Sequence, residues 1–190
     1  MTVDAVPLGG SPDHPLLVLG PSLGTTATNL WSSAAKWLTD HFRVLAWDLP
    51  GHGASPAPDS AVTIEGLAAG VLELVEGTGS FHYAGDSVGG AVGLQLFLDA
   101  HDRVSSATLL CTGARIGTPP MWRERAALAR TSGTAGLVAA SAQRWFGPGF
   151  LDREPAAGEA LLRALTHTDA EGYAGVCDAL AAFDVRGRLS

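Results

Sequence analysis

The chain has few charged residues and few cysteines. Only 16% of its 190 residues are charged, whereas 46% are hydrophobic. This balance excludes a disordered segment and predicts a packed core. The two cysteines, Cys111 and Cys177, are too far apart for a metal-binding pair and too few for a disulfide framework. We therefore expect no metal and no other cofactor.

Long hydrophobic runs and excess positive charge are also missing. No apolar run approaches the ~18 residues of a membrane span, and the N-terminus shows no basic-then-apolar signal pattern. The net charge of −7 and the pI of about 5.2 argue against nucleic acid or an anionic membrane as the main partner. With so few cysteines, a reducing, cytoplasmic location is expected.

Short apolar runs alternate with segments of helical periodicity. The apolar runs are typical of buried strands and lie at 16–19, 44–47, 81–85 and 107–111. Helical patterns lie at about 29–38, 63–75 and 88–99. Thr28 or Asn29 is predicted to cap the first helix and Thr63 the second. This alternation predicts an α/β fold with a parallel sheet and helices on both faces.

The pattern changes after Thr112. Residues 119–188 are rich in alanine, arginine and leucine, are broken by glycines and prolines, and contain no β-branched strand run. We predict a cap of three or four helices on the C-terminal edge of the sheet. The chain accordingly divides into the N-terminal part of a core, residues 1–117, and a helical cap, residues 118–190.

Two Gly-x-Ser-x-Gly patterns occur, at 20–24 and 85–89. The pattern alone is weak in a chain with 24 glycines. A nucleophile elbow needs its serine in a strained turn directly before a helix. Ser87 meets this requirement because residues 88–98 are helix-compatible, whereas a loop follows Ser22. We predict that Ser87 is a catalytic nucleophile; a glycine-rich turn in a non-catalytic domain is the alternative.

The loop around Ser22 suits a different role. Acyl transfer needs backbone N–H donors, one from the residue after the nucleophile and one from the loop after an earlier strand. These donors would be Val88 and Leu23, and Gly24 would let the loop approach closely. An ordinary strand–helix connection is the alternative. Asp86 is predicted to point away from the reaction, as a charge at the helix N-terminus.

Together, segments 16–25, 48–55 and 85–90 resemble the α/β-hydrolase fold. Within that fold, Ser22-Leu-Gly-Thr25 replaces the commoner His-Gly pair and is similar to the 3-oxoadipate enol-lactonases, as are segments 109–117, 144–146 and 171–175. The resemblance covers the whole chain. It implies a serine hydrolase that opens a small enol-lactone to 3-oxoadipate in the β-ketoadipate branch of aromatic catabolism. A carboxylesterase, another hydrolase of this fold, or a non-catalytic ligand-binding module are the alternatives.

The resemblance also suggests which residues bind the substrate. Trp145 is expected to line a pocket beneath the cap, with a core role as the alternative. Because the substrate carries a carboxylate, an arginine clamp is expected. Arg144 and Arg115 are the candidates, and a solvated surface role is the alternative for each.

In this fold an acid and then a histidine follow the nucleophile. His101 falls at the far end of the predicted elbow helix, His167 falls in the predicted cap, and His52 lies in a turn where a structural role is favoured. We therefore expect the N-terminal part of a longer hydrolase, with an incomplete triad, with the C-terminal strand–helix units absent, and inactive by itself. A second chain or a missing segment is expected to complete the open sheet edge.

Overall fold

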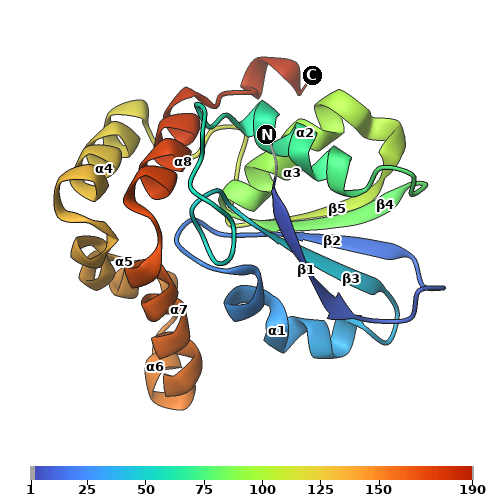
Figure 1. Ribbon diagram of the computed structural model, residues 1–190, viewed down its shortest axis with the longest axis horizontal. Coiled ribbons are helices and arrows are strands. Elements are labelled where there is room, and N and C mark those ends of the chain that lie inside the picture. The colour runs from blue at the N-terminus through green and yellow to red at the C-terminus, as the bar shows by residue number, and fades with distance from the viewer. Residues whose placement is uncertain (1–2, 190) are drawn as a thin grey trace.

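A five-stranded sheet with helices on both faces forms the body of the protein, and further helices lie at one end (Figure 1). The computed structural model describes residues 3–189. The strands are β1 (Asp4–Gly9), β2 (Leu16–Gly20), β3 (Arg43–Asp48), β4 (Phe81–Asp86) and β5 (Val104–Leu110), in the order β1-β3-β2-β4-β5. Strands β2 to β5 are parallel, as predicted. The sheet is nevertheless mixed, because β1 runs antiparallel to β3.

Three helices cover the sheet: α1 (Ala27–Leu38), α2 (Ile64–Leu74) and α3 (Val88–Ala100). In Figure 1, α1 lies on one face and α2 and α3 lie on the other. Strand β2 is buried on both faces, because Leu17 and Leu19 pack in the cluster that includes Trp31 of α1, while Leu16 and Val18 pack in the larger opposite core. Burial on both faces explains why β2 reads as a continuous apolar run.

Helix α1 begins earlier than predicted. Its N-cap is Thr26, whose side chain accepts a hydrogen bond from the Asn29 N–H at 3.1 Å. The Asp48 carboxylate accepts from the Ala27 N–H at 2.6 Å. The prediction of Thr28 or Asn29 as the cap was wrong because Asp48 contributes from a distant part of the chain. The Thr63 cap of α2 is confirmed by its bond from the Gly66 N–H at 2.9 Å.

The region after β5 is helical, as predicted, but holds five α-helices rather than three or four. They are α4 (Pro119–Ser132), α5 (Val138–Trp145), α6 (Phe150–Arg153), α7 (Pro155–His167) and α8 (Ala170–Ala182). Short 3₁₀ turns lie at η1 (His101–Arg103), η2 (Thr134–Leu137) and η3 (Arg186–Arg188). The division between residues 117 and 118 falls in the loop before α4 and stays a prediction.

Strand β5 forms one edge of the sheet. It starts three residues earlier than the predicted 107–111 and ends one residue earlier. In the described part of the chain it pairs only with β4. Ser106, Thr108 and Leu110 alternate along it and are exposed. The face that carries them is therefore uncovered by residues 3–189. No helix in the same residues is long and apolar enough to cross a membrane.

Candidate active site

Ser87 occupies a strained turn between strand β4 and helix α3. It is the single residue between Asp86 and Val88, and its backbone has φ 53° and ψ −111°. A residue other than glycine in such a region costs roughly 1–3 kcal/mol. The Ser87 N–H donates to the Leu110 carbonyl at 2.8 Å, which ties the turn to the end of β5. The turn is therefore held in the conformation that a nucleophile elbow requires.

Small residues allow the close packing around this turn. A Cβ atom on Gly85 would lie 2.3 Å from the Gly89 carbonyl oxygen, and one on Gly89 would lie 2.6 Å from the carbonyl carbon of Gly20. The hydroxyl of Tyr83 donates to the Gly89 carbonyl at 2.8 Å and fixes the first turn of α3. Glycine is therefore required where β4, α3 and the end of β2 meet.

The loop after β2 emerges beside Ser87. Strands β2 and β4 are parallel neighbours with Gly20 opposite Gly85, and the Gly89 N–H donates to the Pro21 carbonyl at 2.9 Å. The N–H groups of Leu23 and Val88 donate to no protein acceptor within residues 3–189. Two free donors therefore accompany the serine, and one of them begins a 13-residue helix whose dipole favours negative charge.

A cavity of about 360 Å³ opens beside Ser87. The core contributes Ser22, Thr25, Leu30, Asp86, Ser87 and Cys111, and the helical region contributes Arg144, Trp145, Phe146, Gly147, Phe150 and Leu161. The rings of Phe146 and Phe150 stack with centroids 5.3 Å apart, and Trp145 meets Phe146 edge-on. The cavity thus combines an aromatic wall with one guanidinium and one carboxylate.

The structure brings some of the predicted site residues together and leaves one apart. Ser87, Arg144 and Trp145 line the same cavity. Leu23 and Val88 are buried and directly follow Ser22 and Ser87, which both line the cavity. Arg115 does not line the cavity, and its guanidinium lies 3.8 Å from the Asp184 carboxylate. A carboxylate clamp can therefore be built on Arg144 but not on Arg115 in this arrangement.

Asp86 and Cys111 were not predicted to belong to the cavity. Asp86 was expected to point away from the reaction, yet it is one of the residues that line the cavity with Ser87. Cys111 directly follows β5, and the Asp86 carboxylate raises the pKa of its thiol. Because β4 and β5 are parallel neighbours, residues at both carboxyl ends meet at one sheet edge. That rule could have identified Cys111.

Phe146 and Phe150 were also missed as cavity residues. Both lie in or beside the short loop between α5 and α6, which has no periodicity that would orient a side chain. Their spacing of four residues next to Trp145, and for Phe146 its place in the enol-lactonase-like segment 144–146, were the signals in the sequence.

No histidine lines this cavity in the part of the chain that the structure describes. His52 is fully buried after β3, with Nδ1 2.9 Å from the Pro50 carbonyl oxygen. Burial lowers its pKa to about 4. His101 is exposed and lies 2.8 Å from the Asp102 carboxylate. Their positions fit the expectation that neither activates Ser87.

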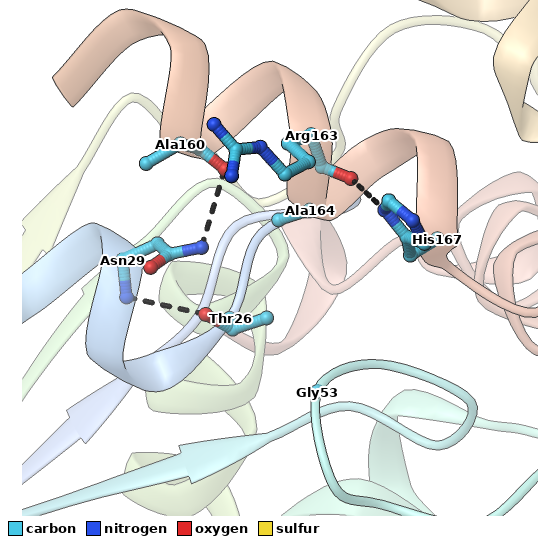
Figure 2. Close-up of a pocket in the computed structure, with 7 residues that line it drawn as sticks. All are labelled: Thr26, Asn29, Gly53, Ala160, Arg163, Ala164 and His167. Carbon is cyan, nitrogen blue, oxygen red and sulfur yellow. Dashed lines mark hydrogen bonds between the residues drawn. The ribbon is translucent and has the colours of Figure 1, made fainter. Parts of the chain in front are cut away.

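His167 belongs to a second cavity, of about 320 Å³, between the start of α1 and helix α7 (Figure 2). Its Nδ1 lies 2.8 Å from the Arg163 carbonyl oxygen. The Asn29 side chain donates to the Ala160 carbonyl at 3.2 Å and joins the two helices. Among the described residues no serine or cysteine lines this cavity, and the Thr26 hydroxyl there caps α1 by accepting from the Asn29 N–H at 3.1 Å.

The mostly parallel sheet and the strained serine turn define an α/β hydrolase. The model of the α/β hydrolase fold family matches residues 15–170, and the chain belongs to this family. It is similar to 3-oxoadipate enol-lactonase 2 of Acinetobacter baylyi, with 35% identity over 95% of this chain and 68% of that protein. It is also similar to 3-oxoadipate enol-lactonase 1 of the same organism, with 32% identity over 98% of this chain and 70% of that protein.

The structure agrees with this family assignment. The crystal structure of the enol-lactonase from Burkholderia xenovorans LB400 matches with a TM-score of 0.92 and 38% identity. The match covers 97% of this chain and 72% of that one. A hydrolase from Pseudomonas aeruginosa matches with a TM-score of 0.89 and 34% identity, over 98% of this chain and 70% of that one. The chain is thus enol-lactonase-like over nearly its whole length.

Proposed function

We propose that this chain carries the nucleophile and oxyanion site of a serine hydrolase that opens 3-oxoadipate enol-lactone to 3-oxoadipate. The observation that carries the proposal is the strained Ser87 turn at a cavity, next to the free N–H groups of Leu23 and Val88. The similarity to enol-lactonases supports the choice of substrate.

The reaction begins when the Ser87 hydroxyl oxygen attacks the lactone carbonyl carbon and its proton passes to a base. The negative charge that develops on the carbonyl oxygen accepts hydrogen bonds from the Leu23 and Val88 N–H groups. The ring C–O bond then breaks, and the released enolate takes up a proton and becomes a ketone, still joined through its carbon chain to the acyl group on Ser87. Water hydrolyses this ester, which yields a carboxylate and regenerates the serine.

Arg144 is proposed to bind the carboxylate that the lactone already carries. It lines the cavity from α5 and takes part in no ion pair within residues 3–189. A guanidinium can bind a carboxylate with two parallel hydrogen bonds. The aromatic wall beside it suits a flat, unsaturated ring.

The base that activates Ser87 is proposed to be none of the histidines in residues 3–189, because none lines the cavity. A serine hydroxyl is a weak nucleophile without an adjacent base. The oxyanion site and substrate binding alone leave roughly 10³–10⁴-fold catalysis over water. The chain of residues 1–190 by itself should therefore turn over slowly.

Lactone hydrolysis by this chain, measured with and without added imidazole, tests the proposal. Imidazole should act as an external base and raise the enzyme-dependent rate about tenfold or more, which is part of the ~10²–10⁴-fold contribution of acid–base catalysis. Ser87→Ala should abolish the stimulation, whereas Ser80→Ala, at an exposed position outside the cavity, should retain it. Stimulation that survives in Ser87→Ala would exclude this serine as the nucleophile.

Rapid hydrolysis without imidazole would instead show that a base lies within this chain. Binding of the lactone without any Ser87-dependent hydrolysis would favour the ligand-binding module. The experiment therefore tests the role of Ser87 separately from the location of the base that activates it.

A further inference from the structure

The Ser87 cavity contains a carboxylate that the proposed hydrolysis does not use. Asp86 ends strand β4, directly precedes Ser87 and lines the cavity beside it. No lysine, arginine or histidine forms an ion pair with it in residues 3–189. The charge of Asp86 is therefore not neutralised by a protein cation in this region.

The field of Asp86 acts on its neighbours in the cavity. The thiol of Cys111 lines the same cavity, and the negative charge of Asp86 is the main cause that raises the pKa of this thiol. A second anion formed next to Ser87 would meet the same field, because like charges in a partly buried site repel more strongly than in bulk water. Apart from the oxyanion position at the Leu23 and Val88 N–H groups, the part of the cavity beside Asp86 is thus unfavourable for a further anion.

The helical side of the cavity has the opposite charge. Arg144 belongs to α5 and lines the cavity without an acidic partner among the described residues. A monoanionic lactone can place its carboxylate at Arg144 while its neutral ring carbonyl lies at Ser87. Ring opening changes this distribution, because it creates a second carboxylate at the carbon that Ser87 attacked, beside Asp86.

We propose that Asp86 determines specificity between the monoanionic lactone and its dianionic ring-opened product, by disfavouring the carboxylate formed at Ser87. This inference rests on the proposed function and adds a role for a residue that the chemical steps do not require. Asp86 weakens product binding without opposing the lactone equally, and it thereby limits product inhibition.

Two unreactive analogues test this role. The substrate analogue is 5-oxotetrahydrofuran-2-acetate, a saturated monoanionic lactone, and the product analogue is 3-hydroxyadipate, the dianion formed when that ring opens. Their dissociation constants are measured by calorimetry at pH 7 in a Ser87→Ala background, so that neither analogue is turned over. In this background the lactone should bind more tightly than the dianion.

Asp86→Asn should improve the relative affinity for the dianion by about 5- to 20-fold. Arg144→Gln should weaken both analogues about equally, because both retain the carboxylate that it binds. Asp40→Asn removes the same charge from an exposed position outside the cavity and should leave the ratio at its starting value. If Asp86→Asn does not fold, Asp86→Ser removes the same charge and carries the same expectation.

If both analogues bind but the ratio of their dissociation constants is unchanged by Asp86→Asn, this inference alone would be overturned. Failure of both analogues to bind would overturn the inference together with the proposed substrate class. The imidazole experiment is independent of both results, because it measures hydrolysis at Ser87 and not the affinity for the product.

Discussion

At the scale of the residue, Ser87 and Cys111 share an unusual backbone. They are the non-glycine residues with positive φ in the described chain, at 53° and 50°, and they follow the adjacent parallel strands β4 and β5. The Ser87 N–H bond to Leu110 joins the two turns. Strain of this kind persists only where the surroundings fix it, so the carboxyl ends of β4 and β5 form one rigid unit around the proposed nucleophile.

His52 gives a residue-scale prediction about pH. Its ordinary pKa of 6.5 is lowered to about 4, mainly by burial. Between these values the unfolded chain binds the proton that the folded protein excludes, so this residue lowers the free energy of unfolding as pH falls from about 6.5 to about 4. The loss is about 3 kcal/mol, from ~1.36 kcal/mol per pKa unit.

Urea denaturation from pH 7 to pH 4 measures this loss. In His52→Asn, the side-chain amide can replace Nδ1 as a donor to the Pro50 carbonyl, and the drop in stability should be smaller by about 3 kcal/mol. His101→Asn changes an exposed histidine and should keep the wild-type slope. An identical slope in all three proteins would contradict a buried, neutral His52. The raised pKa of buried Asp48 acts in the opposite direction and cancels in the comparison.

At the scale of elements, the loop after β2 is fixed by the helices that lie against it. Gly24 has φ +83°, and a Cβ atom there would lie 2.7 Å from Leu165 and 3.3 Å from Tyr173. Tyr173 is fully buried, and its hydroxyl accepts a hydrogen bond from Arg125 Nε at 2.6 Å. Arg125 also donates to Ser141 at 3.0 Å. Helices α4, α5, α7 and α8 therefore all help to position the loop that carries the Leu23 N–H.

Gly24→Ala tests this packing. The side chain would meet Leu165 and would require a left-handed backbone, so we expect a loss of roughly 1–3 kcal/mol in the free energy of unfolding. The imidazole-stimulated rate should also fall, because the oxyanion donor next to it would move. Gly79→Ala is the control, since a Cβ atom there would meet nothing within 4 Å and the φ of Gly79 is ordinary. Equal stability of the two variants would show that the loop is not confined by the helices.

Most elements were predictable because their signal is local. The apolar runs of β2 to β4, the cap and apolar stripe of α2 and the helix-compatible run of α3 come from neighbouring residues. Strand β1 was missed because none of its residues is buried and because it includes Pro7 and Gly9. The Asp48 bond to α1 and the position of Asp86 in the cavity depend on residues that the fold brings together, and no local pattern contains that information.

In the candidate site, too, only the residues with a local signal could be predicted. The turn at Ser87 could be predicted because the small residues and the helix that define it are adjacent to Ser87 in the sequence. Arg144 and Arg115 could not be separated, because their positions depend on how the helices after β5 pack. The structure places one in the cavity and the other beside Asp184.

At the scale of the whole molecule, the β5 edge leads to a prediction about association. Its outer backbone groups have no strand partner in residues 3–189, and Leu110 is 41% exposed. Unpaired edges promote association between chains. The 190-residue chain should therefore form concentration-dependent oligomers in light scattering.

Thr108→Lys should reduce this association, because a charge on an edge strand opposes pairing with another chain. Ser33→Lys adds the same charge at an exposed position on α1 and should have little effect. A stable monomer at all concentrations for the unmodified chain would contradict the open-edge argument.

Ser87 is proposed to act by forming a covalent acyl-enzyme. Mass spectrometry of the chain, quenched in acid while it hydrolyses the enol-lactone in the presence of imidazole, tests it most directly. We expect an added acyl group that maps to the peptide containing Ser87 and is absent from the Ser87→Ala protein. An acyl group on another residue, or continued imidazole-stimulated hydrolysis in Ser87→Ala, would contradict it.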